Sequence, residues 1–186
     1  MLQEMDETSA ARAAHALGMF YVYYPATLHP RTDRNFGNAL LSRWPIEDDR
    51  KLILPHTSWQ LGTQRIAVLG TVRIGAERVL VVTSHFGTIV EIFPWGQRDQ
   101  ARTLLDAVEE YEHVIVAGDF TFFGNLNVNG VMRVNADGSL DQTFNPGLGA
   151  NAWVGNASGA RRSWPESPRR PTSLRAPRPW PPSPSP

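Results

Sequence analysis

Cysteine is absent from the sequence, so disulfide bonds and thiolate metal sites are excluded. Any bound metal would need oxygen or histidine ligands. The sequence also lacks an apolar run long enough to span a membrane, and its first residues lack the basic and apolar stretches of a signal peptide. We therefore expect a cytoplasmic protein without a membrane span, while a functional motif this close to Met1 leaves open a true N-terminus further upstream.

Net charge is lacking too, because 18 basic and 18 acidic residues cancel. The charges are unevenly distributed along the chain. Residues 161–186 carry six arginines against Glu166 alone, a net of +5, which leaves −5 for residues 1–160. A mildly acidic body does not have the charge of a general nucleic-acid binder.

Two helices with an apolar face are predicted. The first is capped by Thr8 or Ser9 and ends at Gly18, a residue that favours the left-handed helix terminus. The second runs from Gly96 to Tyr111, with apolar residues at helical spacing on one face.

Short apolar and β-branched runs predict several strands, at residues 20–24, 38–42, 52–54, 65–74, 78–83 and 114–117. Gly75-Ala-Glu77 joins two of them into a hairpin. The last strand is fully apolar and ends just before Asp119. Strands, a helix, a buried strand and then an acidic residue form an α/β pattern, in which ligand sites gather at strand ends.

Four short motifs follow one another in the first two-thirds of the chain. They are Leu2-Gln-Glu4, Gly37-Asn-Ala-Leu-Leu-Ser-Arg43, Thr83-Ser-His-Phe86 and Val116-Ala-Gly-Asp-Phe120, with Gln97-Arg98 opening the second helix. Each has an ordinary structural explanation when taken alone. A carboxylate at a strand end is more often a cap or surface group, and a lone histidine after an apolar strand is more often a structural group.

In this order and spacing, residues 2–120 resemble the endonuclease/exonuclease/phosphatase superfamily, the DNase I-like hydrolases. The resemblance implies an α/β fold, a partial four-layer sandwich of two packed mixed β-sheets flanked by helices. It also implies a phosphodiester hydrolase that depends on a divalent metal, Mg²⁺ or Mn²⁺. The substrate would be a nucleic acid, a phospholipid head group or a small phosphodiester, and we expect a monomer.

The resemblance also implies roles for single residues. Glu4 would be the principal metal ligand, and Asp119 would position the attacking water or add to the metal site. His85 would lie against the phosphate or the leaving oxygen, as a donor when protonated. The residues implied to line the substrate groove are Asn38, Arg43 and Thr121. For Arg43, a surface salt bridge is an equally good interpretation.

The sequence departs from the family pattern in three places. The strand that precedes the Gln-Glu motif is missing, Thr121 stands where the family has asparagine, and no histidine follows His113 to act as the family's general base. Loss of a positioned general base typically costs about 10²–10⁴-fold in rate. We therefore expect a truncated or chimeric chain of weak activity, with one sheet left with an open apolar edge.

Residues 116–154 resemble instead a delta-60 repeat, a β-rich unit with Gly-Asp-Phe-Thr near one end and Asn-Ala-Asp-Gly-Ser-Leu-Asp further on. Asp137 and Asp141 suggest turns rather than a calcium loop, because their spacing does not match an EF-hand. The alternative function is therefore a non-enzymatic β-repeat protein with a degenerate hydrolase-like domain.

Three segments are thus predicted: a hydrolase-like domain at 1–120, a repeat-like segment at 121–154, and a disordered Arg/Pro/Ser-rich tail at 155–186. Because residues 116–120 fit both families, we expect the chain to switch between them there. The composition after Gly159 is that expected from a shifted reading frame. Sequencing the genomic locus across codons 116–122 and 155–165 tests both interpretations.

Overall fold

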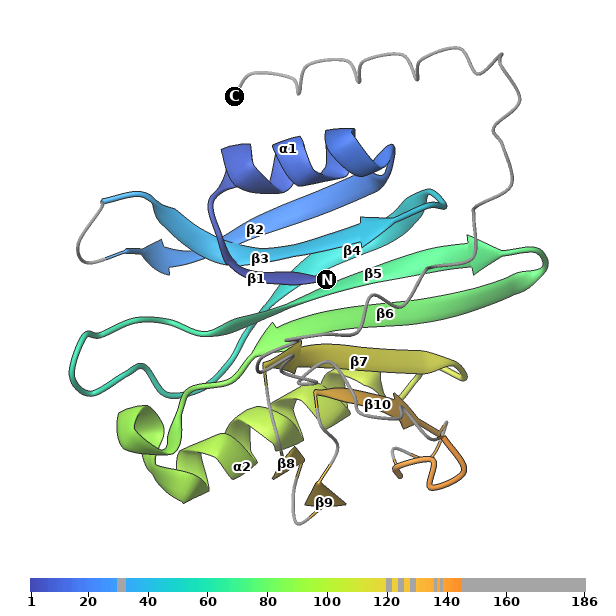
Figure 1. Cartoon of the computed structure of the whole chain (residues 1–186). Coiled ribbons are helices and arrows are strands. Elements are labelled where there is room, and N and C mark those ends of the chain that lie inside the picture. The colour runs from blue at the N-terminus through green and yellow to red at the C-terminus, as the bar shows by residue number, and fades with distance from the viewer. Residues whose placement is uncertain are drawn as a thin grey trace, which may run out of the picture. The chain divides into compact units, whose positions relative to one another are not determined.

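Two β-sheets face each other, and each carries one helix on its outer side (Figure 1). The computed structural model describes residues 1–29, 33–119, 122–123, 126–127, 130–135, 137 and 139–144. Within them the layers run α1, three-stranded sheet, five-stranded sheet, α2. This confirms the predicted partial four-layer α/β sandwich. Thr121 and the tail at 155–186 lie outside the described residues.

The three-stranded sheet has the order β1-β3-β2 and is antiparallel throughout; its strands are β1 (Leu2–Met5), β3 (Asn35–Ser42) and β2 (Phe20–Leu28). The sequence placed the end of β2 before Pro25, but the strand continues through it. Proline is tolerated there because β2 is an edge strand and its pairing shifts register between Pro25 and Thr27.

Helix α1 (Glu7–Leu17) covers this sheet and ends at Gly18 in the left-handed conformation, as predicted. The predicted N-terminal cap, Thr8 or Ser9, is wrong. Asp6 is the cap, and its carboxylate accepts hydrogen bonds from the Ser9 backbone at 2.9 Å and the Ser9 hydroxyl at 3.0 Å. The carboxylate also lies at the positive end of the helix dipole, which an uncharged hydroxyl exploits less well.

The five-stranded sheet has the order β10-β7-β6-β5-β4; its strands are β4 (Ile46–Ile53), β5 (Ile66–Ile74), β6 (Glu77–His85), β7 (Val114–Asp119) and β10 (Val131–Val134). The β5–β6 hairpin is confirmed, with Gly75 at a φ of 65° in its turn. Only β6 and β7 pair in parallel, and α2 connects them. A separate short hairpin is formed by β8 (Phe122–Phe123) and β9 (Leu126–Asn127).

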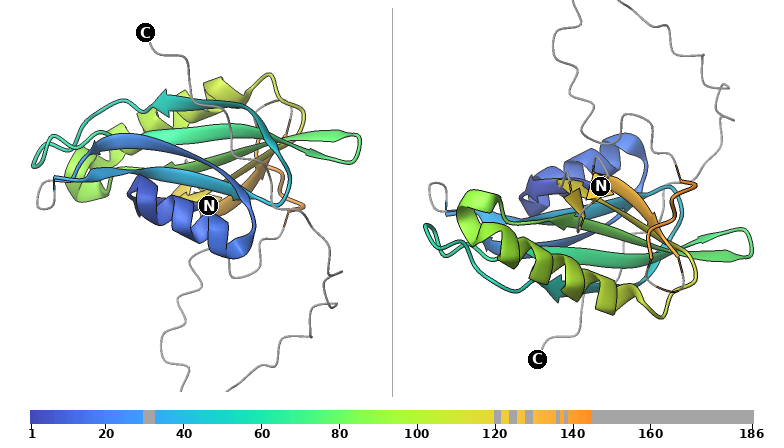
Figure 2. Two further views of the ribbon diagram at one scale, coloured as in Figure 1. Left: turned by 90° about the horizontal axis from the view of Figure 1, so that it is seen from above. Right: turned by 90° about the horizontal axis from the view of Figure 1, so that it is seen from below.

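Helix α2 (Ile89–Val108) lies across the five-stranded sheet (Figure 2, right). It begins earlier than the predicted Gly96 because Thr88 and Glu91 form a capping box. Its first turns are interrupted at Phe93, which precedes Pro94 and cannot continue the helix. No helix among the described residues is long and apolar enough to cross a membrane.

The core divides into two layers because alternate side chains of each strand face opposite sides. Between the sheets lie Leu40, Ile66 and Val68. Between the five-stranded sheet and α2 lies a larger cluster that includes Leu69, Val82, Leu104, Val116 and Met132. Successive residues of β5 from Ile66 to Leu69, and of β6 from Leu80 to Val82, thus alternate between the two clusters, which helps to fix the register of both strands.

The sequence predicted an open apolar edge on one of the sheets, and in the larger sheet the edge beside β7 is occupied. All four residues of β10 pair antiparallel with β7, from Val131 opposite Ala117 to Val134 opposite Val114. Met132 and Val134 are each 2% exposed and belong to the α2-side core. The repeat-like segment therefore supplies a partner strand for β7, so the expected open apolar edge is not found at β7.

Candidate active site between the sheets

The polar site lies where β6 and β7 end side by side, facing β1 of the other sheet (Figure 1). The parallel register places His85 beside Asp119. His85 Nε2 lies 3.7 Å from Asp119 Oδ2, and His85 Nδ1 lies 3.5 Å from Glu4 Oε1. The structure thus brings together Glu4, His85 and Asp119, three residues that the sequence singled out from three separate motifs.

A β-bulge in β1 aims Glu4 at this site. The register runs from Leu2 opposite Ala39 to Met5 opposite Gly37, so Gln3 and Glu4 together oppose Asn38. Glu4 has a φ of 56°, a left-handed conformation that is unusual for a residue with a side chain.

The consequence of the bulge is that two successive side chains reach the same neighbouring strand. Gln3 Nε2 donates to Thr83 Oγ1 at 2.8 Å, and Glu4 meets His85 two residues further along β6. A regular strand would point successive side chains to opposite faces. The left-handed backbone at Glu4 therefore lets its carboxylate reach His85 in the candidate site.

His85 is buried and lies between carboxylates that are exposed. Its side chain is 8% exposed, against 55% for Glu4 and 66% for Asp119. Burial lowers the pKa of His85 below its ordinary value, and the guanidinium of Arg65 lowers it further, while Glu4, Asp119 and Glu91 act in the opposite direction. The neutral imidazole is therefore favoured, and it still offers one N–H as a donor.

Arg65 and Glu91 are site residues that sequence reasoning missed. Arg65 Nη1 lies 3.2 Å from His85 Nδ1, and Arg65 Nη2 donates to both carboxylate oxygens of Glu91 at 3.0 Å. Burial acts to raise the pKa of Glu91, but hydrogen bonds from Thr88 and Arg65 outweigh it and hold that pKa below its usual value. The signal that could have identified Arg65 in the sequence is its position directly before the apolar residues of β5.

Asn38 and its neighbour Gly37, both on β3, make close contacts with the adjoining strands beside the site. Asn38 Nδ2 donates to the backbone oxygen of Ile66 at 2.9 Å, which links the two sheets. Asn38 and His85 also line the same small recess. A Cβ on Gly37 would lie 2.1 Å from the backbone oxygen of Tyr24, so only glycine permits this close approach of β2. The role of Asn38 in substrate binding stays a prediction.

Of the two other predicted groove residues, Arg43 is not brought to this group. Arg43 is exposed and follows the last residue of β3, five residues beyond Asn38. Five strand residues span roughly 16 Å, and β3 runs away from the ends of β6 and β7 in Figure 1. Thr121 lies outside the described residues.

Carboxylate oxygens are the ligands that a hard divalent cation prefers. Glu4 and Asp119 are the predicted ligands, and both supply carboxylate oxygens on either side of His85. Magnesium commonly binds through one or two carboxylates and retains several waters. Among the described residues no group of three or more His, Asp or Glu side chains could hold a metal ion, so Glu4 and Asp119 stay predicted ligands.

The structure is a two-sheet α/β sandwich in which Glu4, His85 and Asp119 lie together between the sheets. This fold and this group can be compared with known families. Residues 1–120 match the Endonuclease/Exonuclease/phosphatase family. The chain belongs to this family. Residues 113–144 also match a Domain of unknown function (DUF5122) beta-propeller, so β7 lies within both matches. No curated protein matches the chain.

Solved structures resemble the chain at the level of the fold. The human Nocturnin catalytic domain with bound sulfate anion is 20% identical, covers 67% of this chain and 50% of its own, and has a TM-score of 0.51. A humanized D. rerio TDP2 is 20% identical over 68% and 48%, with a TM-score of 0.49. A Bacteroides vulgatus family protein is 15% identical over 67% and 50%, with a TM-score of 0.47. The chain spans about half the length of these structures.

Proposed function

We propose that this chain is a phosphoester hydrolase domain that acts on phosphodiesters with the help of a divalent metal, Mg²⁺ or Mn²⁺. The observation that carries the proposal is the meeting of Glu4 and Asp119, from facing sheets, on either side of the buried His85. Phosphodiesters repel anionic nucleophiles, so hydrolysis needs positive charge and aligned donors at the phosphate. Family membership of residues 1–120 supports the same reaction class.

The carboxylates of Glu4 and Asp119 would hold the cation. When bound, a divalent ion supplies charge neutralisation and polarises the phosphoryl oxygen. Glu4 is already aimed between the sheets by the bulge in β1, so little rearrangement of the backbone is needed to present its oxygens.

His85 and Asp119 supply the groups that act on the substrate and the water. The Nε2–H of a neutral His85 donates to a phosphoryl oxygen or to the leaving oxygen. It is free to do so because 3.7 Å to Asp119 exceeds hydrogen-bond length. Asp119 orients the attacking water by accepting one of its hydrogens. The expected rate is low, because no histidine follows His113 to act as the family's general base.

The substrate class is tested with a nucleic acid, a phospholipid and a small diester. Plasmid DNA, sphingomyelin vesicles and bis-p-nitrophenyl phosphate cover these, each assayed with Mg²⁺, with Mn²⁺ and with a chelator. We expect metal-dependent hydrolysis of at least the small diester, which makes the fewest demands on the groove.

Glu4→Gln and Asp119→Asn test the site itself. Each should lower the rate by about 10²-fold or more, since each removes a ligand or a water-orienting group. Glu77→Gln is a matched control, because Glu77 also lies 3.5 Å from a histidine, His113, but on the exposed rim of the sheet. Hydrolysis that is equally fast in wild type, E4Q and D119N would contradict the proposed site.

A second candidate is a non-enzymatic β-repeat protein, favoured by the pairing of β10 with β7 and by the match at residues 113–144. Under that proposal the chain divides at 120 and at 154, and β7 serves the repeat as well as the hydrolase-like domain. Sequencing the locus downstream of codon 154 discriminates the candidates. Further copies of the repeat there, together with no metal-dependent hydrolysis, would favour the second.

A further inference from the structure

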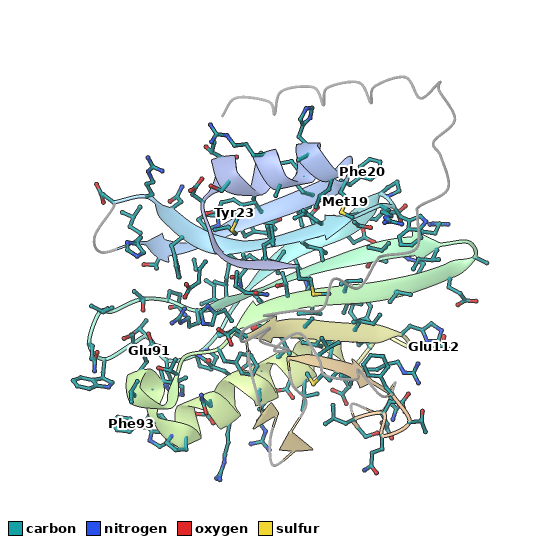
Figure 3. All side chains as sticks on the ribbon, viewed as in Figure 1. Met19, Phe20, Tyr23, Glu91, Phe93 and Glu112 are labelled. Atoms are coloured by element: carbon teal, nitrogen blue, oxygen red, sulfur yellow. The ribbon has the colours of Figure 1, made fainter. Side chains whose placement is uncertain are left out.

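A buried chain of three side chains leads from the start of α2 to the candidate active site. Glu91, labelled in Figure 3, lies in the first turn of α2 and binds Arg65 through both oxygens at 3.0 Å. Arg65 in turn lies 3.2 Å from Nδ1 of His85. The side chain of Arg65 is 9% exposed and that of Glu91 is 15% exposed. Buried charges of this kind are costly unless they are paired, and the Nε of Arg65 has no hydrogen-bond partner among the described residues.

The chemistry of arginine decides which ring nitrogen of His85 carries the proton. A guanidinium has five N–H donors and no acceptor. At 3.2 Å from Arg65, Nδ1 of His85 must therefore offer its lone pair. The proton of the neutral ring then lies on Nε2, which faces Asp119 and the space for the phosphate.

Glu4 competes for the same ring nitrogen. Its Oε1 lies 3.5 Å from Nδ1 and, as a carboxylate oxygen, would accept a proton placed there. If Nδ1 carried the proton, Nε2 would present a lone pair to the phosphate, and two acceptors would face each other. The balance between Arg65 and Glu4 thus sets whether His85 donates to the substrate or repels it.

We propose that Arg65 is a positioning residue that keeps the proton of His85 on Nε2, and that Glu91 holds Arg65 in place for this task. The inference deepens the proposed function, on which its catalytic consequence rests. The position of the proton on Nε2 is inferred from the contacts of Arg65 with His85 and Glu91 alone. Glu91 is well placed for the task because it also accepts a hydrogen bond from the Thr88 backbone at 2.8 Å, which ties Arg65 to the start of the helix.

The position of the proton is read directly by NMR on the full-length chain labelled with ¹⁵N-histidine. Two-bond ¹H–¹⁵N correlation spectra at about pH 8, where imidazole is neutral, distinguish the two tautomers of each ring. His85 is assigned from the signal missing in His85→Gln. We expect Nε2–H in the wild-type protein and Nδ1–H in Arg65→Met, where Glu4 alone faces Nδ1.

Three further variants complete the test. Arg65→Lys keeps a donor toward Nδ1 and should retain Nε2–H, while Glu91→Gln should give a mixture of both tautomers. Arg73→Met is the matched control, because Arg73 lies on β5, the strand that Arg65 precedes, in an exposed pair with Glu47 and should leave His85 unchanged. If Arg65→Met does not fold, Glu91→Gln carries the test. Nδ1–H in the wild type, or a tautomer that responds neither to Arg65→Met nor to Glu91→Gln, would overturn the proposal.

Hydrolysis of bis-p-nitrophenyl phosphate gives an independent measurement. We expect Arg65→Met to lower kcat by about 10–100-fold, a range typical of groups that orient an active-site histidine, with a smaller change in KM. A tautomer that responds to Arg65 in a protein without hydrolase activity would refute the proposed function and leave the positioning role intact. Hydrolysis that needs Glu4 and Asp119, combined with an unresponsive tautomer, would refute only the positioning role.

Discussion

The candidate active site and the segment at 130–144 are built from contacts of very different range. Gln3 bonds to Thr83, 80 residues away, and Glu4 and Asp119 reach His85 from other strands. In the later segment the side-chain hydrogen bonds are local. Asp137 accepts from Ser139, and Asp141 accepts from Thr143 and pairs with Arg133.

This difference determines what a sequence pattern can show. Local hydrogen bonds follow from residue type and spacing, so the turns at Asp137 and Asp141 are confirmed as turn chemistry. The geometry of the site depends on strand register, on a bulge and on which sheet faces which. Three tests, in order of expected effect, challenge the contrast between the two regions.

The largest effect is expected where the later segment enters the shared core. Met132→Ala should lower the free energy of unfolding by about 2–5 kcal/mol, as Leu104→Ala should on α2, because both side chains are buried in one cluster. Urea unfolding measures both. Val90→Ala, at an exposed position, serves as the control and should change stability by less than about 0.5 kcal/mol. A neutral Met132→Ala would show that β10 is not part of the folded unit.

A smaller effect is expected at the bulge. Glu4→Gly should be more stable than Glu4→Ala by about 1 kcal/mol, because glycine adopts a φ of 56° without strain. Both variants lack the carboxylate, so the comparison isolates the backbone. At position 3 the order should be reversed. Gln3→Gly should be less stable than Gln3→Ala by about 0.5–1 kcal/mol, since Gln3 has no positive φ. Equal stabilities of the two Glu4 variants would argue against the left-handed conformation.

The last test separates the two regions by pH. The pKa of His85 is lowered by burial, so its neutral form contributes stability that is complete above about pH 6.5 and is lost as the pH falls. The pKa of Asp141 is lowered to about 2 by hydrogen bonds from Thr143 and Arg133. Its contribution is therefore present above the ordinary value of 3.8 and is lost as the pH falls toward 2.

Urea unfolding as a function of pH measures both windows. His85→Gln should remove the loss of stability that begins below about pH 6.5, and Asp141→Asn should remove the loss at lower pH. A His85→Gln variant that loses as much stability as the wild type between about pH 7.5 and about pH 5.5 would contradict the burial of a neutral His85.

Much of the fold was readable from the sequence. The apolar face of α2, the β5–β6 hairpin and Asp119 at the end of β7 follow from periodicity and turn residues. Family motifs supplied Glu4, His85 and Asp119 in order, and the structure brings these three together.

The rest depended on contacts that leave no local pattern. The bulge at Glu4 lets Gln3 and Glu4 both reach β6, an arrangement that no period of β1 reveals. Arg65 had the appearance of a strand-end surface charge, since its partners lie 20 and 26 residues away. The pairing of β10 with β7 joins a strand that lies only within the repeat match to a strand that both matches share.

The parallel pairing of β6 with β7 also determines which changes of length the site can tolerate. His85 and Asp119 are neighbours in the ladder, while the connection between the strands contains all of α2. Residues gained or lost in the loops around α2 would leave the spacing of the two side chains unchanged. One residue inserted within 114–118 would turn Asp119 to the opposite face of the sheet, because side chains alternate along a strand. Loops beside this site can therefore diversify through insertions and deletions, whereas β6 and β7 can change only by substitution.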